Sequence, residues 1–211
     1  TFGHDEVFDH KVIDWMKRLR HRRGKPPAAP ASIVDARDVV NEMRLVKTAP
    51  EIEQMRASVE LSAEAHILAM EYCHPGMHEY ELQALIEYHF RRSGAEYPAY
   101  ETIVGAGNNA TILHYTENRA TLEDDDVVLI DAGAELEFYA GDITRSFPVD
   151  GEFTPAQRDV YQAVLDAEIS AIDDCEPGIP FDELQNRTVR RLTESMVDLG
   201  LLEGSVDELI K

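Results

Sequence analysis

The chain has 211 residues, 44% of them hydrophobic, which is enough apolar material for one large domain or for one domain and part of another. Its 41 acidic and 20 basic residues give a formal net charge of -21, and so acidic a surface repels nucleic-acid phosphates and anionic lipids. The composition therefore argues against nucleic-acid and membrane partners. The sequence contains no readable 18-residue apolar span and no readable secretory signal, so we predict a cytoplasmic protein.

A helix over residues 5–23 is the first predicted element, and a proline-rich stretch follows it. The stretch GKPPAAPAS, residues 24–32, cannot continue a helix and is typical of a linker. We therefore predict a domain boundary at this stretch.

Two helices are predicted next. Thr48 and Glu51 have the spacing of a capping box, so a long helix should begin there and end before Pro75 and Gly76. Its buried stripe is predicted to comprise Ile52, Met55, Val59, Ser62, His66, Ala69 and Cys73. The second helix should end at Gly94 and carry on one face Leu82, Leu85, Ile86, His89 and Phe90.

Short strands are predicted after these helices. The segments ETIV (101–104) and TILHY (111–115) flank GAGNNA, and because a β-like segment follows the glycines, a hairpin turn is favoured over a phosphate-binding loop. The apolar run at residues 127–130 is short and β-branched, which is typical of a buried strand. It ends in the charge of Asp131, which requires a partner.

The helix pair then recurs at a constant offset of 102 residues. Thr154 and Gln157 form another capping box. Matching pairs are Cys73 and Cys175, Pro75 and Pro177, Gly76 and Gly178, Glu81 and Glu183, Leu82 and Leu184, and Gln83 and Gln185. Adding the offset to positions 114 and 131 would place a second set of strands at about 216 and about 233, past the last residue. We therefore expect a chain truncated in its second half.

Asp131 and Asp142 bracket the tract that follows the buried strand. If a hairpin turn is centred between Leu136 and Glu137, the two aspartates face each other with Cβ atoms ~4.5 to 5.5 Å apart. Like charges so placed repel unless a cation or a proton lies between them, and two carboxylates can bind a pair of divalent ions, preferably manganese or magnesium. The alternative is that both are hydrated charges at strand ends, because one bulge would change the register.

His114 is predicted to lie at a strand end, in ILHYTEN. Beside a metal pair its imidazole could donate a hydrogen bond to an oxyanion, although a lone histidine is more often structural. Further candidates, as groups that would contact the substrate or orient the metal ligands, are Tyr100, Tyr115, Thr144 and Arg145.

Four segments, ILHYTEN, VLIDAG, YAGDITRSFPV and FTPAQRDVYQAVLDA, together resemble the bacterial Xaa-Pro aminopeptidase (aminopeptidase P) family of metallopeptidases. The resemblance implies an α+β pita-bread fold, with two pseudo-symmetric halves of helices over a curved antiparallel sheet, here truncated in the second half. It also implies that the chain consists of three segments. These are the C-terminal tail of an N-terminal domain at 1–25, a linker at 26–34, and a partial catalytic domain at 35–211 that holds the first half and the helices of the second.

The resemblance further implies an activity and roles for the site residues. Asp131 and Asp142 would be ligands shared by two metal ions, usually manganese, and His114 would contact the scissile carbonyl or the tetrahedral intermediate. A metal-bridging hydroxide would release the N-terminal residue from peptides with proline in second position. One histidine and two glutamates that complete the family's metal site belong to motifs absent from this sequence, so the 211-residue chain alone is expected to be inactive.

The resemblance also suggests a homo-oligomer. Two alternative functions stay open. A pita-bread module that has lost its metals could bind peptides or proteins, although such a module has no reason to oppose Asp131 and Asp142. A methionine aminopeptidase would share the fold and the types of metal ligand. The predicted linker and the helix before it imply a further domain upstream, which favours aminopeptidase P.

Overall fold

The computed structural model describes residues 3–21, 30 and 32–211, in two compact units, Thr1–Glu53 and Gln54–Lys211. In the first unit, the helix predicted at 5–23 is observed as α1 (Glu6–His21), and α2 (Ala36–Leu45) follows it. Asp35 caps α2 by accepting a hydrogen bond from the backbone N–H of Arg37. Most of the predicted linker at 26–34 lies outside the described residues, so the domain division there stays a prediction.

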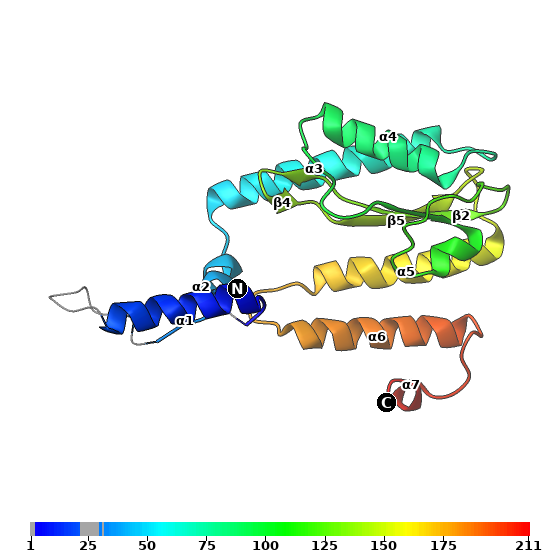
Figure 1. Cartoon of the computed structure of the whole chain (residues 1–211). Helices are drawn as coiled ribbons and strands as arrows, with labels where there is room; N and C mark the ends of the chain where they lie inside the picture. The colour runs from blue at the N-terminus through cyan, green and yellow to red at the C-terminus, as the bar shows by residue number, and fades with distance from the viewer. Residues whose placement is uncertain (1–2, 22–29, 31) are drawn as a thin grey trace. The chain divides into compact units, whose positions relative to one another are not determined.

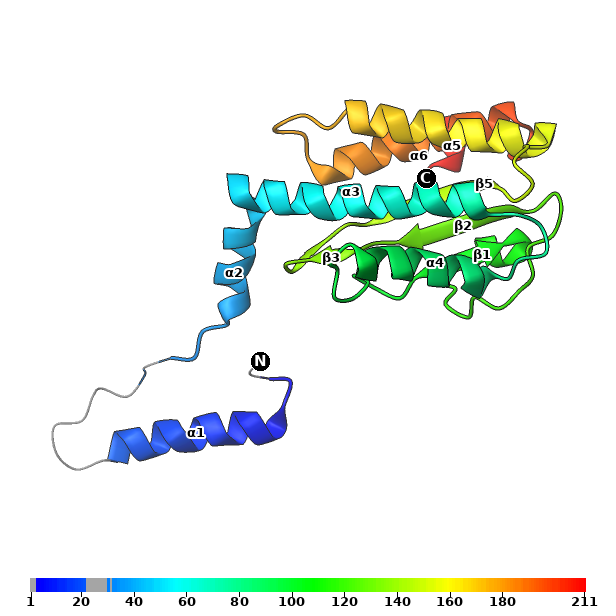
Figure 2. The same ribbon diagram turned by 90° about the horizontal axis from the view of Figure 1, so that it is seen from above.

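The second unit consists of helices and an antiparallel sheet (Figure 1). The helices are α3 (Ala49–Tyr72), which begins at the end of the first unit, α4 (Glu79–Arg92), α5 (Pro155–Asp173), α6 (Phe181–Asp198), α7 (Val206–Leu209) and the 3₁₀ helix η1 (Gly107–Thr111). The main sheet has the order β1-β2-β5, and its strands are β1 (Ile103–Ala106), β2 (Val127–Ala132) and β5 (Ile143–Pro148). A two-stranded sheet is formed by β3 (Glu135–Leu136) and β4 (Tyr139–Ala140). Both α3 and α4 cover the same face of the main sheet (Figure 2).

The face of α3 that packs in the core consists mainly of small residues. Ser58, Ser62, Ala65 and Ala69 are buried, so the helix backbone can approach the strands closely. Most of the bulky core residues come from α4, as predicted, and from the strands: Leu82, Ile86, Phe90, Val104, Val128 and Ile130. The predicted stripe of α3 is wrong at Ile52 and Val59, which are exposed. Ile52 precedes the first buried residue, Ser58, and at Val59 the buried face passes through its neighbours Ser58, Leu61 and Ser62.

The hairpin predicted around GAGNNA is not formed. The segment continues from β1 into η1, residues 111–115 form no strand, and the antiparallel partner of β1 is β2, with Val104 opposite Ile130. The left-handed φ of Gly107 (53°) turns the chain out of the strand. Side chains then satisfy the backbone here, since Asn118 Oδ1 accepts from the N–H of Val104.

The hairpin that carries the two aspartates is confirmed, but its predicted register is wrong. Leu136 pairs with Tyr139 and Asp131 pairs with Thr144, so the turn is centred between Glu137 and Phe138. Both of these turn residues have positive φ, 49° and 70°, as in the type I′ turns that match the twist of a hairpin. Asp142 is therefore a diagonal neighbour of Asp131 on the same face and does not stand directly opposite it.

A close crossing of the hairpin strands lies between the two aspartates. A Cβ atom on Gly133 would lie 1.5 Å from the carbonyl oxygen of Gly141, and one on Gly141 would lie 2.3 Å from Ser62 Oγ. Only glycine fits at both positions. Ser62 Oγ also accepts a hydrogen bond from the N–H of Ala134, so α3 holds this crossing in place.

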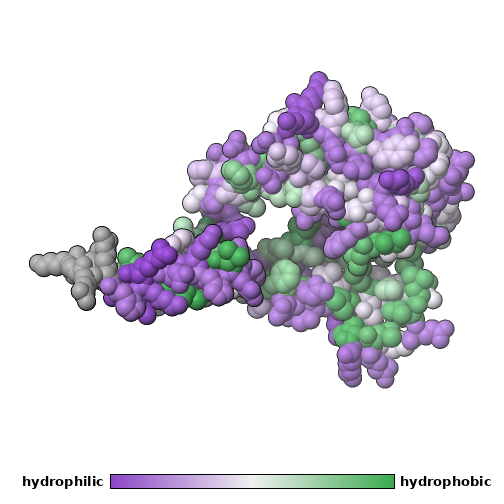
Figure 3. Space-filling view, viewed as in Figure 1, coloured by the Kyte–Doolittle hydropathy of each residue, from purple (hydrophilic) through white to green (hydrophobic). Residues whose placement is uncertain are grey.

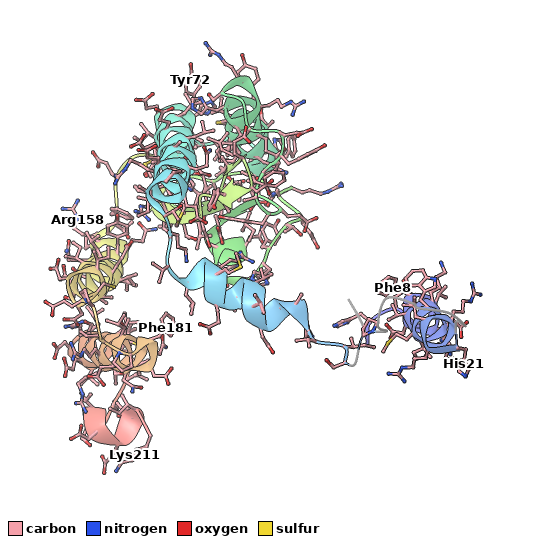
Figure 4. All side chains as sticks on the ribbon, turned by 90° about the vertical axis from the view of Figure 1, so that its left-hand side faces the viewer. Phe8, His21, Tyr72, Arg158, Phe181 and Lys211 are labelled. Atoms are coloured by element: carbon pink, nitrogen blue, oxygen red, sulfur yellow. The ribbon has the colours of Figure 1, made fainter. Side chains whose placement is uncertain are left out.

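The predicted repeat is visible in the helices. α4 begins at Glu79 and α6 begins at Phe181, which is the 102-residue offset read from the sequence. Gly76 and Gly178, in the matching turns, both have positive φ, 87° and 95°. α5 and α6 pack side by side (Figures 1 and 4). No strand follows α6 in the described chain.

The second helix pair buries little of its apolar surface. Val164 and Ile172 of α5 are 54% and 63% exposed, and Phe181 at the start of α6 is 80% exposed (Figure 4). Apolar surface is correspondingly visible around these helices and α7 (Figure 3). Despite this apolar surface, none of the described helices combines the length and hydropathy needed to cross a bilayer.

Candidate functional site

A cavity of about 400 Å³ opens at one end of the main sheet. Ile103 starts β1 and pairs with Asp131 near the end of β2, while Asp142 directly precedes β5. The antiparallel pairing of the strands thus brings these three positions together at the same end of the sheet. The cavity is lined by Tyr100, Glu101, Ile103, His114, Thr116, Asp131 and Asp142.

The centre of the site is a cluster of two carboxylates and one phenol. The hydroxyl of Tyr100 lies 2.6 Å from Asp131 Oδ1 and 3.1 Å from Asp142 Oδ1. Because both oxygens lie within hydrogen-bond distance of one hydroxyl, the two aspartates are brought together despite the changed register. Among the described residues, neither aspartate forms an ion pair with lysine, arginine or histidine.

Tyr100 acts in this cluster as a hydrogen-bond donor. Burial raises the pKa of Tyr100 well above its ordinary value, and the neighbouring charges of Asp131 and Asp142 raise it further. The phenol therefore keeps its proton. Its single proton is shared by two negatively charged acceptors, so the negative charge at this edge of the sheet is only partly neutralised.

The donor set suits a hard divalent cation but does not complete a coordination sphere. Two carboxylates that converge without a cationic side chain are the kind of oxygen ligands that manganese and magnesium prefer. Across the described residues, no group of three or more histidine, cysteine, aspartate or glutamate side chains could hold a metal ion. Asp131 and Asp142 thus fit as two ligands of a site that needs further groups.

His114 lines the same cavity, but the prediction that it ends a strand is wrong. It lies in the turn after η1, is exposed, and has a φ of 55°. The following residue, Tyr115, points the other way, since it is only 9% exposed and its hydroxyl donates to Glu79 Oε2 at 2.8 Å. The structure therefore places the imidazole of His114 at the cavity that holds the two aspartates.

The remaining candidates divide into one that lies beside the aspartates and two that do not. Thr144 stands opposite Asp131 in the ladder but does not line the cavity. Arg145 lies 3.7 Å from Glu168 of α5, so its guanidinium is engaged elsewhere. Tyr115 is turned inward, as described above. Neither of the last two has a direct role at the cavity.

Sequence reasoning missed Glu101, Ile103 and Thr116 of the cavity wall. The first two follow Tyr100 within three positions, and Thr116 lies two positions after His114. Because His114 lies in a turn with a left-handed φ, strand alternation does not relate it to Thr116, and no periodic signal identifies the three residues. A second cavity of about 420 Å³ shares Tyr100, Glu101 and Thr116 with the first.

Comparisons with known proteins point to one group of enzymes. The model of metallopeptidase family M24 matches residues 53–206. The Xaa-Pro aminopeptidase of Escherichia coli is 49% identical over 195 residues, which cover 92% of this chain and 44% of that protein. The chain thus spans less than half the length of this curated relative.

Solved structures are similar over the whole chain. The Pseudomonas aeruginosa aminopeptidase PepP has a TM-score of 0.94 and 47% identity, covering 99% of this chain and 47% of that one. A zinc-substituted E. coli aminopeptidase P in complex with product has a TM-score of 0.93 at the same identity, covering 99% of this chain and 47% of that one. This likeness confirms the α+β pita-bread fold predicted from the sequence.

Proposed function

Because the chain belongs to metallopeptidase family M24, we propose that the protein is a metal-dependent aminopeptidase that releases the N-terminal residue from peptides with proline in second position. The observation that carries this proposal is the convergence of Asp131 and Asp142 on the hydroxyl of Tyr100 in an open cavity. The name of the E. coli relative, Xaa-Pro aminopeptidase, supports the substrate class.

Two divalent ions, preferably manganese, are the proposed cofactors, and Asp131 and Asp142 would hold them. When bound, such ions lower the pKa of coordinated water and polarise a peptide carbonyl. Carboxylate oxygens favour manganese, although the zinc-substituted E. coli relative makes zinc the second metal to test. The predicted hydroxide nucleophile belongs to this proposal.

The chain's own side chains have distinct tasks in this mechanism. Tyr100 donates to both aspartates and so fixes the orientation of their carboxylates. The exposed imidazole of His114 can donate a hydrogen bond to the carbonyl oxygen of a substrate in the cavity, where negative charge develops during attack. The binding of the peptide beside Glu101 and Thr116 would bring its second peptide unit towards the adjoining cavity.

A pair of substrates tests this function against the methionine aminopeptidase alternative. With the protein at its natural length and manganese present, we expect hydrolysis of an Ala-Pro peptide and no hydrolysis of a Met-Ala peptide. A chelator should abolish the activity, and manganese should restore it. Release of methionine alone would contradict the proposal, and a protein that binds no metal and hydrolyses neither peptide would favour the binding-module alternative.

A cytoplasmic location and a homo-oligomeric state are further parts of the proposal. The net charge of -21 supports the absence of nucleic-acid and membrane partners. The 211-residue chain alone is proposed to be inactive, since the described residues supply only two converging ligands.

A further inference from the structure

Glu79 is a buried carboxylate with an unusual set of partners. It is the first residue of α4 and is 0% exposed. Its Oε1 accepts hydrogen bonds from the N–H of Ala106 at 2.9 Å and from Asn109 Nδ2 at 3.0 Å. Its Oε2 accepts from the hydroxyl of Tyr115 at 2.8 Å and from the N–H of Ala120 at 2.9 Å. All four partners can donate, which suits a group that only accepts.

These four partners belong to one segment, the loop at residues 107–120 and the residue before it. We name residues 107–120 the His114 loop. Ala106 precedes its first residue, Ala120 is its last, and Asn109 and Tyr115 lie between them. A backbone bond from the N–H of Glu79 to the carbonyl of Ala120 adds a fifth contact, at 3.0 Å. A single side chain thus ties the loop at both ends and in the middle.

The attachment of Tyr115 determines where His114 lies. Tyr115 is drawn inward onto Glu79, and His114, next to it, has a left-handed φ of 55° that a residue other than glycine seldom adopts. Such a conformation persists only where its surroundings hold it. The contacts of Glu79 with Tyr115 and with both ends of the loop lie on either side of His114, whose imidazole is exposed at the cavity.

Among the residues that the structure describes, hydrogen bonds alone hold the carboxylate of Glu79. Within the described chain Glu79 has no cationic partner, and a buried charge is unfavourable unless it is fully hydrogen-bonded. The four donors and the N-terminus of α4 offset this cost. An amide in the same place has one acceptor oxygen and cannot accept from both sides of the pocket.

We propose that Glu79 is a positioning residue for His114, because its carboxylate fixes the His114 loop in the conformation that presents the imidazole to Asp131 and Asp142. The inference rests on the proposed function in one respect only, namely that His114 takes part in catalysis. The placement of the loop can be measured without any catalysis.

The first test measures loop placement in the protein at its natural length. Glu79→Gln keeps the shape of the side chain and turns its amide group towards two of the four donors. We expect hydrogen exchange at the amides of Ala106 and Ala120 to rise at least ~10-fold, while exchange in the core of α3 stays unchanged. Glu81→Gln, in the same turn of α4 but exposed, is the matched control: glutamine can still accept the capping hydrogen bond from the N–H of His78, so both amides should stay protected. Unchanged exchange in Glu79→Gln would overturn the inference.

The second test measures catalysis by the protein at its natural length on an Ala-Pro peptide. Glu79→Gln should lower kcat by roughly 10- to 100-fold with KM and manganese content nearly unchanged, because a small displacement of a catalytic group has effects of that size. In a His114→Ala background the same substitution should have almost no further effect on kcat. An equal loss in both backgrounds would show a general structural role and would overturn the proposal.

A misfolded Glu79→Gln variant and an inactive unsubstituted protein would each leave the inference testable. If Glu79→Gln does not fold, Tyr115→Phe removes one of the four donors and leaves the carboxylate in place, and kcat should fall by a smaller factor that again vanishes without His114. If the unsubstituted protein hydrolyses no Xaa-Pro peptide, the proposed function fails, while the exchange measurement still decides whether Glu79 places the loop.

Discussion

Replacing Asp142 by asparagine should remove manganese from the protein and reduce kcat/KM for an Ala-Pro peptide by at least ~10³-fold. The reason is that a metal ion contributes several kcal/mol of charge stabilisation in the transition state, and each 1.36 kcal/mol corresponds to a factor of ten. Asparagine preserves the shape of the side chain and an oxygen that can accept from Tyr100, so the fold should be retained. Metal content after dialysis, measured by elemental analysis of the protein at its natural length, checks the expectation.

The matched control for this substitution is Asp159→Asn. Asp159 is an exposed aspartate on α5 that does not line the cavity, so its replacement should leave manganese content and kcat/KM unchanged. An unaltered manganese stoichiometry in Asp142→Asn would contradict the assignment of Asp142 as a ligand. Metal loss in both variants would point to an effect of net charge and would also contradict it.

Replacing His114 by alanine should lower kcat by roughly 10²- to 10³-fold while manganese stays bound. This is the size of effect that follows the loss of one hydrogen-bond donor to a developing oxyanion. The imidazole is exposed at the cavity, so its removal leaves no buried void and the fold should be unaffected. Steady-state kinetics on an Ala-Pro peptide, together with metal analysis of the same sample, separates the two effects.

His74→Ala serves as the control for this second variant. His74 lies exposed after the end of α3, away from the residues that line the cavity, and its loss should change neither kcat nor metal content. If manganese is lost together with activity in His114→Ala, His114 is a ligand and the proposed division of roles is wrong. If kcat is unchanged, the imidazole has no part in the reaction.

Local signals predicted the helices well because each depends on a few neighbouring residues. The capping box of Thr154 and Gln157 is formed as predicted at the start of α5, and Gly94, with a φ of 104°, follows α4. The repeat was also readable, since matching residues recur at a fixed offset and the helices begin at the matching positions. These features require no knowledge of contacts between distant segments.

The register of the hairpin could not be predicted because its turn lacks the usual signal. Glu137 and Phe138 adopt positive φ, whereas glycine or asparagine normally announces such a turn. The sequence nevertheless predicted that Asp131 and Asp142 meet. It did so because a displacement of two positions along one strand returns a side chain to the same face.

The strand predicted at residues 111–115, within the His114 loop, is wrong for a different reason. The conformation of this loop is fixed by side chains far away in the sequence, among them Glu79 and Gln83, which accept hydrogen bonds across 27 to 41 positions. Contacts of that length leave no periodic pattern. The buried role of Glu79 was invisible for the same reason, since nothing in its local sequence separates it from the exposed Glu81 two positions later.

The most direct test of the central claim is anomalous diffraction from crystals of the protein at its natural length, grown with manganese and measured on both sides of the manganese absorption edge. The account predicts strong anomalous density within ligand distance of the carboxylates of both Asp131 and Asp142. Density that contacts neither aspartate, or none at this edge of the sheet, would contradict the metal site and with it the proposed peptidase mechanism.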